Sequence, residues 1–88
     1  MYKLVKRILD KSRETGRDVY VACDMCVAED KDNADAIRAA GDIVDTHYGV
    51  ITKLRREDDD ASIEKLCELV ASGDVTALRE FKDEVKAR

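Results

Sequence analysis

Residues 18–28 read Asp-Val-Tyr-Val-Ala-Cys-Asp-Met-Cys-Val-Ala, and the conformation of this stretch decides the fold of the chain. Its first half is apolar and rich in β-branched residues, which favours a buried strand over residues 18–24. A helix is the alternative, because the same stretch also contains an apolar stripe at helical spacing. The members of that stripe are Val19, Cys23, Cys26 and Val27.

On the N-terminal side of this stretch, residues 2–15 are predicted to form a helix. The apolar residues between Leu4 and Leu9 recur at helical spacing, and basic residues fill the other faces. Gly16 is well placed to end this helix, because glycine adopts the positive φ of a C-terminal cap without steric cost.

On the C-terminal side, a polar break leads into a helix predicted from about residue 33 to Tyr48. Gly41 lies inside this helix, where glycine costs about 1 kcal/mol relative to alanine, so we expect another backbone to cross closely there. Gly49 is predicted to end the helix, and residues 50–54 are predicted to form a second short strand.

The remainder of the chain predicts a helical hairpin. Two apolar-striped helices are separated by Ser72-Gly73-Asp74, with Asp74 as the expected N-cap of the last one. The whole order predicts an α/β or α+β fold that is mainly helical. A βαβ unit (strands 18–24 and 50–54) carries an N-terminal helix and a C-terminal helical hairpin, within a single domain of residues 1–88. An all-α bundle is the alternative.

Charge is abundant and unevenly distributed. Charged residues make up 41% of the 88-residue chain and its net charge is −4. Residues 1–17 carry six basic and two acidic side chains, whereas residues 18–49 carry eight acidic and two basic ones. The basic N-terminal helix is therefore a candidate docking surface for an acidic protein or a nucleic acid. Its candidate partner-binding residues are Lys3, Lys6, Arg7, Lys11 and Arg13.

The three cysteines form the sharpest local motif. Cys23 and Cys26 have the two-residue spacing that brings two sulfurs to one metal ion, and His47 and Cys67 would complete a tetrahedral zinc set. A single such pair is more often a pair of buried structural thiols, so we expect no cofactor and keep zinc as the alternative. An odd number of cysteines and the lack of an apolar N-terminal run predict a cytoplasmic protein without a signal peptide or membrane span.

An acidic loop over residues 23–35 follows the first predicted strand. Ligands of open α/β sheets bind beyond the carboxyl ends of strands, so this loop is a candidate site for a metal ion or a nucleotide. The residues that would bind it are Asp24, Glu29, Asp30 and Asp32.

No nucleophile, base and orienting group occur at a spacing typical of catalysis, which favours a non-enzymatic role. We therefore expect a small protein-binding module, an accessory or inhibitory protein that acts through charged helix surfaces. Two strands alone make a poor sheet, so a third strand from a second copy, and hence a homodimer, is expected. The alternatives are a small-ligand protein that uses the acidic loop, and a nucleic-acid-binding protein that uses the basic N-terminal helix.

Overall fold

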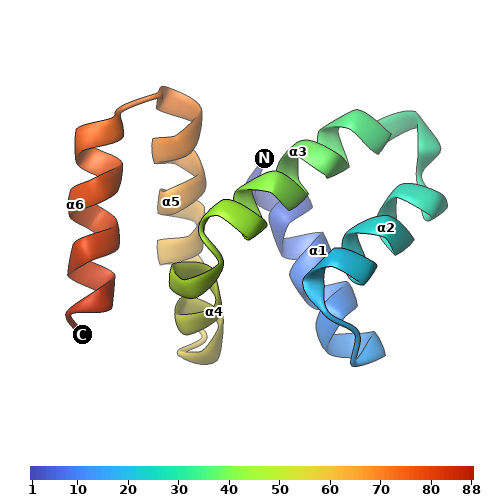
Figure 1. Cartoon of the computed structure of the whole chain (residues 1–88), viewed down its shortest axis with the longest axis horizontal. Coiled ribbons are helices and arrows are strands. Elements are labelled where there is room, and N and C mark those ends of the chain that lie inside the picture. Colours follow the sequence, from blue (N-terminus) through green and yellow to red (C-terminus); the bar gives the residue numbers. More distant parts are fainter. The chain divides into compact units, whose positions relative to one another are not determined.

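A computed structural model describes all 88 residues, and it contains helices but no strand (Figure 1). The elements are α1 (Tyr2–Thr15), α2 (Val19–Glu29), the 3-10 helix η1 (Lys31–Asn33), α3 (Ala34–Thr46), α4 (Tyr48–Arg56), α5 (Asp60–Ser72) and α6 (Val75–Lys86). The expected α/β fold with a βαβ unit is therefore wrong. The chain is all-helical, as the alternative expected.

The stretch that was expected to be a strand forms α2. Asp18 caps this helix, since its carboxylate accepts a hydrogen bond from the backbone N–H of Val21 at 2.9 Å. Ala22 and Cys26, one helical turn apart, are completely buried. A helix satisfies its backbone hydrogen bonds internally, whereas a lone strand pair would leave its edges unsatisfied, and this explains why the strand prediction failed.

Residues 50–54, the second predicted strand, belong to α4. Val50, Ile51 and Leu54 are buried and lie at the i, i+1 and i+4 positions of a helix face. Gly49 does not end α3 as predicted, because α3 ends at Thr46 and Gly49 lies in the first turn of α4. The short apolar run fits either a strand or a helix, and the spacing of its buried residues is that of the helix that forms.

The contacts of the chain cluster into two compact units, Met1–Thr46 and His47–Arg88. In the N-terminal unit, helices α1, α2 and α3 pack against one another (Figure 1, blue to green). Its core residues are Val5, Ile8, Leu9, Ala22, Cys26, Ile37, Ala40 and Val44. In the C-terminal unit, α4, α5 and α6 do the same. The core residues there include Val50, Ile51, Leu54, Ile63, Leu66, Cys67, Phe81 and Val85. That the chain forms one cooperative domain stays a prediction.

The backbone crossing expected at Gly41 is not found, but the side chain of Cys23 on α2 comes close to this glycine. A Cβ atom added at Gly41 would lie 2.6 Å from the Sγ of Cys23. A larger residue at position 41 would therefore require the Sγ of Cys23 to move. The predicted end of α1 at Gly16 is confirmed by its φ of 68°, and the predicted break at residues 72–74 contains Gly73 with φ of 73° and Asp74, which caps α6 through the N–H of Ala77.

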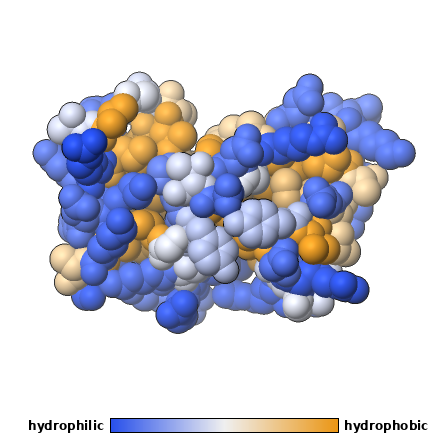
Figure 2. All heavy atoms as spheres, viewed as in Figure 1, coloured by the Kyte–Doolittle hydropathy of each residue, from blue (hydrophilic) through white to orange (hydrophobic).

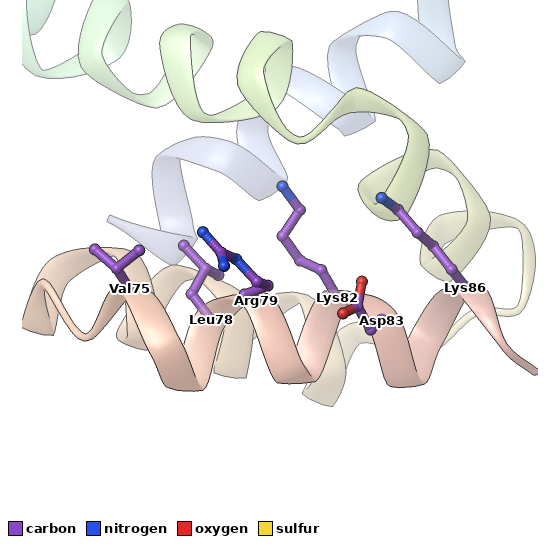
Figure 3. A pocket seen from close by; sticks show the side chains of 6 residues that line it. All are labelled: Val75, Leu78, Arg79, Lys82, Asp83 and Lys86. Carbon is purple, nitrogen blue, oxygen red and sulfur yellow. The ribbon is translucent and has the colours of Figure 1, made fainter.

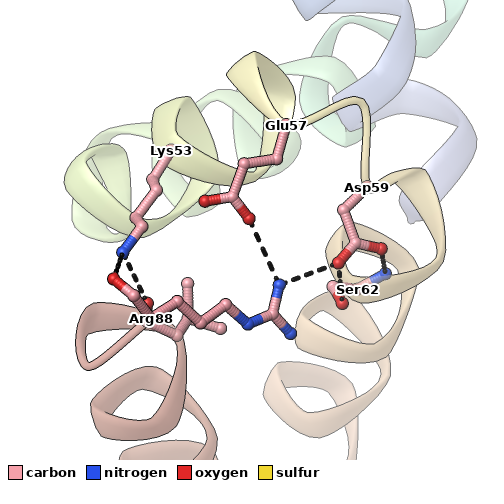
Figure 4. A network of polar contacts seen from close by, with 6 residues as sticks. Lys53, Glu57, Asp59, Ser62 and Arg88 are labelled. Carbon is pink, nitrogen blue, oxygen red and sulfur yellow. Dashed lines mark hydrogen bonds and ion pairs between the residues drawn. The ribbon is translucent and has the colours of Figure 1, made fainter.

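A polar network ties the end of α6 to the other helices of the C-terminal unit (Figure 4). The Nζ of Lys53 donates to the carbonyls of Val85 and Arg88 at 2.9 and 3.1 Å. The Arg88 guanidinium contacts Glu57 at 3.3 Å and Asp59 at 2.9 Å. Asp59 also caps α5 by accepting from the backbone N–H of Ser62. The network anchors the C-terminal end of α6 to α4 and to the start of α5.

Hydrophilic side chains cover most of the face drawn in Figure 2, and apolar atoms show between them in limited patches. The larger exposed apolar residues are Met1, Tyr20, Val21, Tyr48 and Val75. None of the helices combines the length and apolar character needed to cross a membrane.

Candidate functional site

The basic residues of α1, predicted to bind a partner, are largely engaged inside the N-terminal unit. Lys6 pairs with Asp10 at 2.9 Å, one turn along the same helix. Arg7 and Lys11 reach the C-terminal end of α2, where Arg7 lies 3.1 Å from Asp30 and Lys11 lies 2.8 Å from Glu29. Lys3 and Arg13, the other two members of the predicted set, are exposed.

Glu29 and Asp30 belong to the predicted ligand loop, so two regions predicted as separate sites contact each other. The hydrogen bond with Glu29 raises the pKa of Lys11. Hydrogen bonds from Asn33 and then from Arg7 lower the pKa of Asp30. The basic helix and the acidic loop thus neutralise each other in this structure, and each has less charge to offer a partner.

The four acidic residues predicted to hold a metal ion or nucleotide do not form one cluster. Glu29 and Asp30 are in the ion pairs above, Asp32 is exposed in η1, and Asp24 is exposed on α2. Neither unit contains a group of three or more histidine, cysteine, aspartate or glutamate side chains arranged to hold a metal ion.

The four zinc candidates are distributed over both units. Cys23 and Cys26 lie one turn apart on α2, His47 precedes α4, and Cys67 lies in α5. Cys26 and Cys67 are buried, Cys23 is half-buried, and all three thiols are free. Burial raises the pKa of each thiol, so these cysteines are protonated and poor ligands or nucleophiles at neutral pH.

A groove of about 370 Å³ between α2 and α3 is the best-defined hollow of the N-terminal unit. Its lining residues are Val19, Tyr20, Cys23 and Asp24 of α2 and Arg38, Gly41, Asp42 and Asp45 of α3. The helices run antiparallel here, because Tyr20 contacts Asp45 and Cys23 contacts both Gly41 and the carbonyl of Ile37. The hydroxyl of Tyr20 donates to Asp45 at 2.5 Å, which fixes the aromatic ring in the groove wall.

The groove is acidic around an apolar middle. Asp24, Asp42 and Asp45 supply three carboxylates, and Arg38 is the only cation in the lining. Arg38 is itself 3.7 Å from Asp35 on the same helix. Burial, followed by the charges of Asp24 and Asp42, raises the pKa of Cys23, so this thiol is a neutral part of the groove. Of the predicted site residues, the groove contains Asp24 and Cys23.

A second, smaller hollow of about 260 Å³ follows one face of α6 (Figure 3). Its lining residues are Val75, Leu78, Arg79, Lys82, Asp83 and Lys86. This face of α6 was not predicted as a site from the sequence. The signal was present, because Arg79, Lys82 and Lys86 recur at the i, i+3 and i+7 positions of a predicted helix and so share one side of it.

Comparison of the chain with protein-family models, with curated proteins and with solved structures finds no match. The function is therefore argued from the geometry of these surfaces.

Proposed function

We propose that the protein is a non-enzymatic binding protein for a small organic cation, which it holds in the groove between α2 and α3. The observation that carries this proposal is the groove itself, with three carboxylates and one guanidinium around an apolar floor. Its volume of about 370 Å³ lies in the range typical of small-molecule sites. The proposal keeps the predicted small-ligand role and moves it from the acidic loop to this groove.

Charge selects the kind of ligand. With the carboxylates of Asp24, Asp42 and Asp45 ionised and Arg38 protonated, the lining carries a net negative charge, which attracts an ammonium or guanidinium group. The same charge repels the phosphates of a nucleotide, the other ligand considered for the acidic loop. The ring of Tyr20 adds a face over which an organic cation can lie.

The apolar floor selects the body of the ligand. Part of the groove lining carries no strongly hydrogen-bonding side chain. This part consists of Val19, the half-buried Cys23 and the Cα of Gly41. A short hydrocarbon or aromatic segment attached to the cation would cover this floor. A bare metal ion would leave it exposed, so an organic cation fits better than the predicted metal.

Binding without chemistry is supported by the state of the thiol. The raised pKa of Cys23 keeps it protonated at neutral pH, and a protonated thiol is a poor nucleophile. The three free thiols suit a reducing compartment, and we propose the cytoplasm as the place of action.

The test compares two probes of the same shape and opposite charge, phenethylamine and phenylacetate, by NMR titration of the backbone amides. Phenethylamine is expected to bind with a Kd of about 1 mM, typical of so small a ligand, and to shift amides of α2 and α3. Phenylacetate is expected to leave these amides unshifted. Equal shifts with both probes, or shifts confined to other helices, would overturn the proposal.

A pair of matched variants locates the site. Asp24→Asn/Asp42→Asn removes two groove carboxylates and is expected to weaken phenethylamine binding by about tenfold. Glu14→Gln/Asp32→Asn removes the same charge from exposed positions outside the groove and should leave the Kd unchanged. Equal weakening in both variants would mean that net charge alone, and no defined groove, attracts the amine.

A further inference from the structure

The face of α6 shown in Figure 3 combines cations with apolar groups along one continuous stripe. Its six members share one side of the helix, with the apolar Val75 and Leu78 towards its N-terminal end and four charged residues after them: Arg79, Lys82, Asp83 and Lys86. Val75 is 65% exposed, although a valine gains free energy by burial. An exposed apolar residue therefore lies on the same face as three cations.

The cations of the stripe have no partners within the chain. Arg79, Lys82 and Lys86 make neither an ion pair nor a side-chain hydrogen bond, and Figure 3 shows all three side chains extending from the helix. This differs from α1, where Lys6, Arg7 and Lys11 are all held by carboxylates. Asp83 offsets one of the three positive charges, so the stripe remains basic.

We propose that the α6 stripe docks an acidic amphipathic helix of a partner protein. The apolar residues of that helix would cover Val75 and Leu78, and its carboxylates would pair with Arg79, Lys82 and Lys86. A protein helix fits better than a nucleic acid for two reasons. A phosphate backbone has no apolar group for Val75, and it would be repelled by Asp83 in the middle of the stripe. The stripe shares no residue with the α2–α3 groove, so this interaction is independent of ligand binding there.

The experiment measures binding of a synthetic peptide by fluorescence anisotropy. The probe is a labelled peptide of about three heptads, with leucine at the first and fourth positions and glutamate at the fifth and seventh, which disfavours its self-association. Wild-type protein is expected to bind it, and the affinity should fall as salt is raised. A single-stranded oligonucleotide of similar charge is the comparison probe.

Charge reversal tests the stripe against a matched control. Arg79→Glu/Lys82→Glu/Lys86→Glu is expected to weaken peptide binding at least tenfold, about the effect of turning three attractions into repulsions. Arg17→Glu/Lys31→Glu/Arg56→Glu changes the net charge equally at exposed positions elsewhere and should alter the affinity by less than about threefold. Equal loss in the two triple variants would overturn the proposal.

The apolar part of the stripe gives an independent readout. Val75→Ser is expected to weaken the peptide by about threefold, because it removes buried methyl groups from the contact, whereas Val21→Ser on α2 should have no effect. Tighter binding of the oligonucleotide than of the peptide would overturn the proposal in favour of a nucleic acid. Self-association of the protein that the stripe triple variant abolishes would overturn it in favour of a second copy.

Discussion

Helices α1 and α6 are both rich in basic residues, but α1 pairs three of its cations with carboxylates of the same unit, whereas the cations on one face of α6 are unpaired. In α1, Lys6, Arg7 and Lys11 lie 2.8–3.1 Å from carboxylates of the same unit. In α6, Arg79, Lys82 and Lys86 have no such partners. The comparison teaches that a count of charges along a sequence does not locate a charged surface, because the fold decides which charges find a partner inside the molecule.

The largest expected effect tests whether the units that contain these two helices unfold together. Ile37→Ala in α3 and Ile63→Ala in α5 each remove a fully buried side chain and should lower the free energy of unfolding by about 2–5 kcal/mol. If the chain is one domain, as predicted, both variants lower the midpoint of one shared transition in urea. Hydrogen exchange that accelerates only in the mutated unit would show two independent domains. If an alanine variant does not fold, Ile→Val at the same position is used as a milder substitution in the same measurement.

The second effect concerns His47, the only histidine of the chain, which belongs to the unit that contains α6. Burial and then the charge of Lys82 lower its pKa, so protonation favours the unfolded state. Stability from this residue is fully present above about pH 6.5 and is lost as the pH falls towards the lowered pKa of the folded state. The slope is at most about 1.4 kcal/mol per pH unit for one proton.

The measurement is urea unfolding between pH 7.5 and pH 5, with His47→Gln as the matched variant. The variant is expected to lose the pH dependence over this range. A wild-type stability that rises as the pH falls through 6.5 would contradict the assigned direction of the shift.

A third effect tests the close contact between Gly41 and Cys23 in the α2–α3 groove. Gly41→Ala should gain up to about 1 kcal/mol of helix propensity but also forces a methyl group onto the Sγ of Cys23. In a Cys23→Ala background that clash is gone, so the same substitution should be more favourable by about 1 kcal/mol. Gly49→Ala, which has open space at its Cβ position, is the control and should stabilise in either background. Additive effects of the Gly41 and Cys23 substitutions would refute the close contact.

The smallest effect returns to the two basic helices directly. Arg7→Ala breaks the contact with Asp30 and should lower the melting temperature by a few degrees at most, less so at high salt. Arg79→Ala breaks no ion pair and should leave the melting temperature unchanged. Equal melting temperatures for the two variants at low salt would remove the basis of the comparison.

The sequence predicted the helix ends better than the central helices. Gly16 as a left-handed cap and Asp74 as a side-chain cap were assigned correctly, because both are local features of the chain, whereas Gly49 was wrongly assigned as the end of α3. Residues 18–24 and 50–54 were assigned wrongly, because short apolar runs fit both a buried strand and a buried helix. The choice between strand and helix depended on packing between segments that are distant in the sequence. Gly41 was the one residue that indicated such packing, because a close contact was expected there.

The candidate sites could be predicted only in part, for a similar reason. Asp24 and Cys23 were singled out, but their groove partners Tyr20, Asp42 and Asp45 became visible only when α2 was helical and antiparallel to α3. The ion pairs of Arg7 with Asp30 and of Lys11 with Glu29 join residues that are 23 and 18 positions apart. No local sequence pattern could therefore predict these ion pairs. The α6 stripe was predictable from its spacing and was overlooked because the N-terminal helix carries more charge.

The half-buried thiol of Cys23 gives the groove a built-in chemical reporter. Cys26 and Cys67 are buried, so a thiol reagent such as iodoacetamide should reach Cys23 first. The raised pKa of Cys23 makes this alkylation slow enough to follow by mass spectrometry. A molecule that fills the groove would shield the sulfur, and the rate of labelling would then measure occupancy without any tag or dye on the protein.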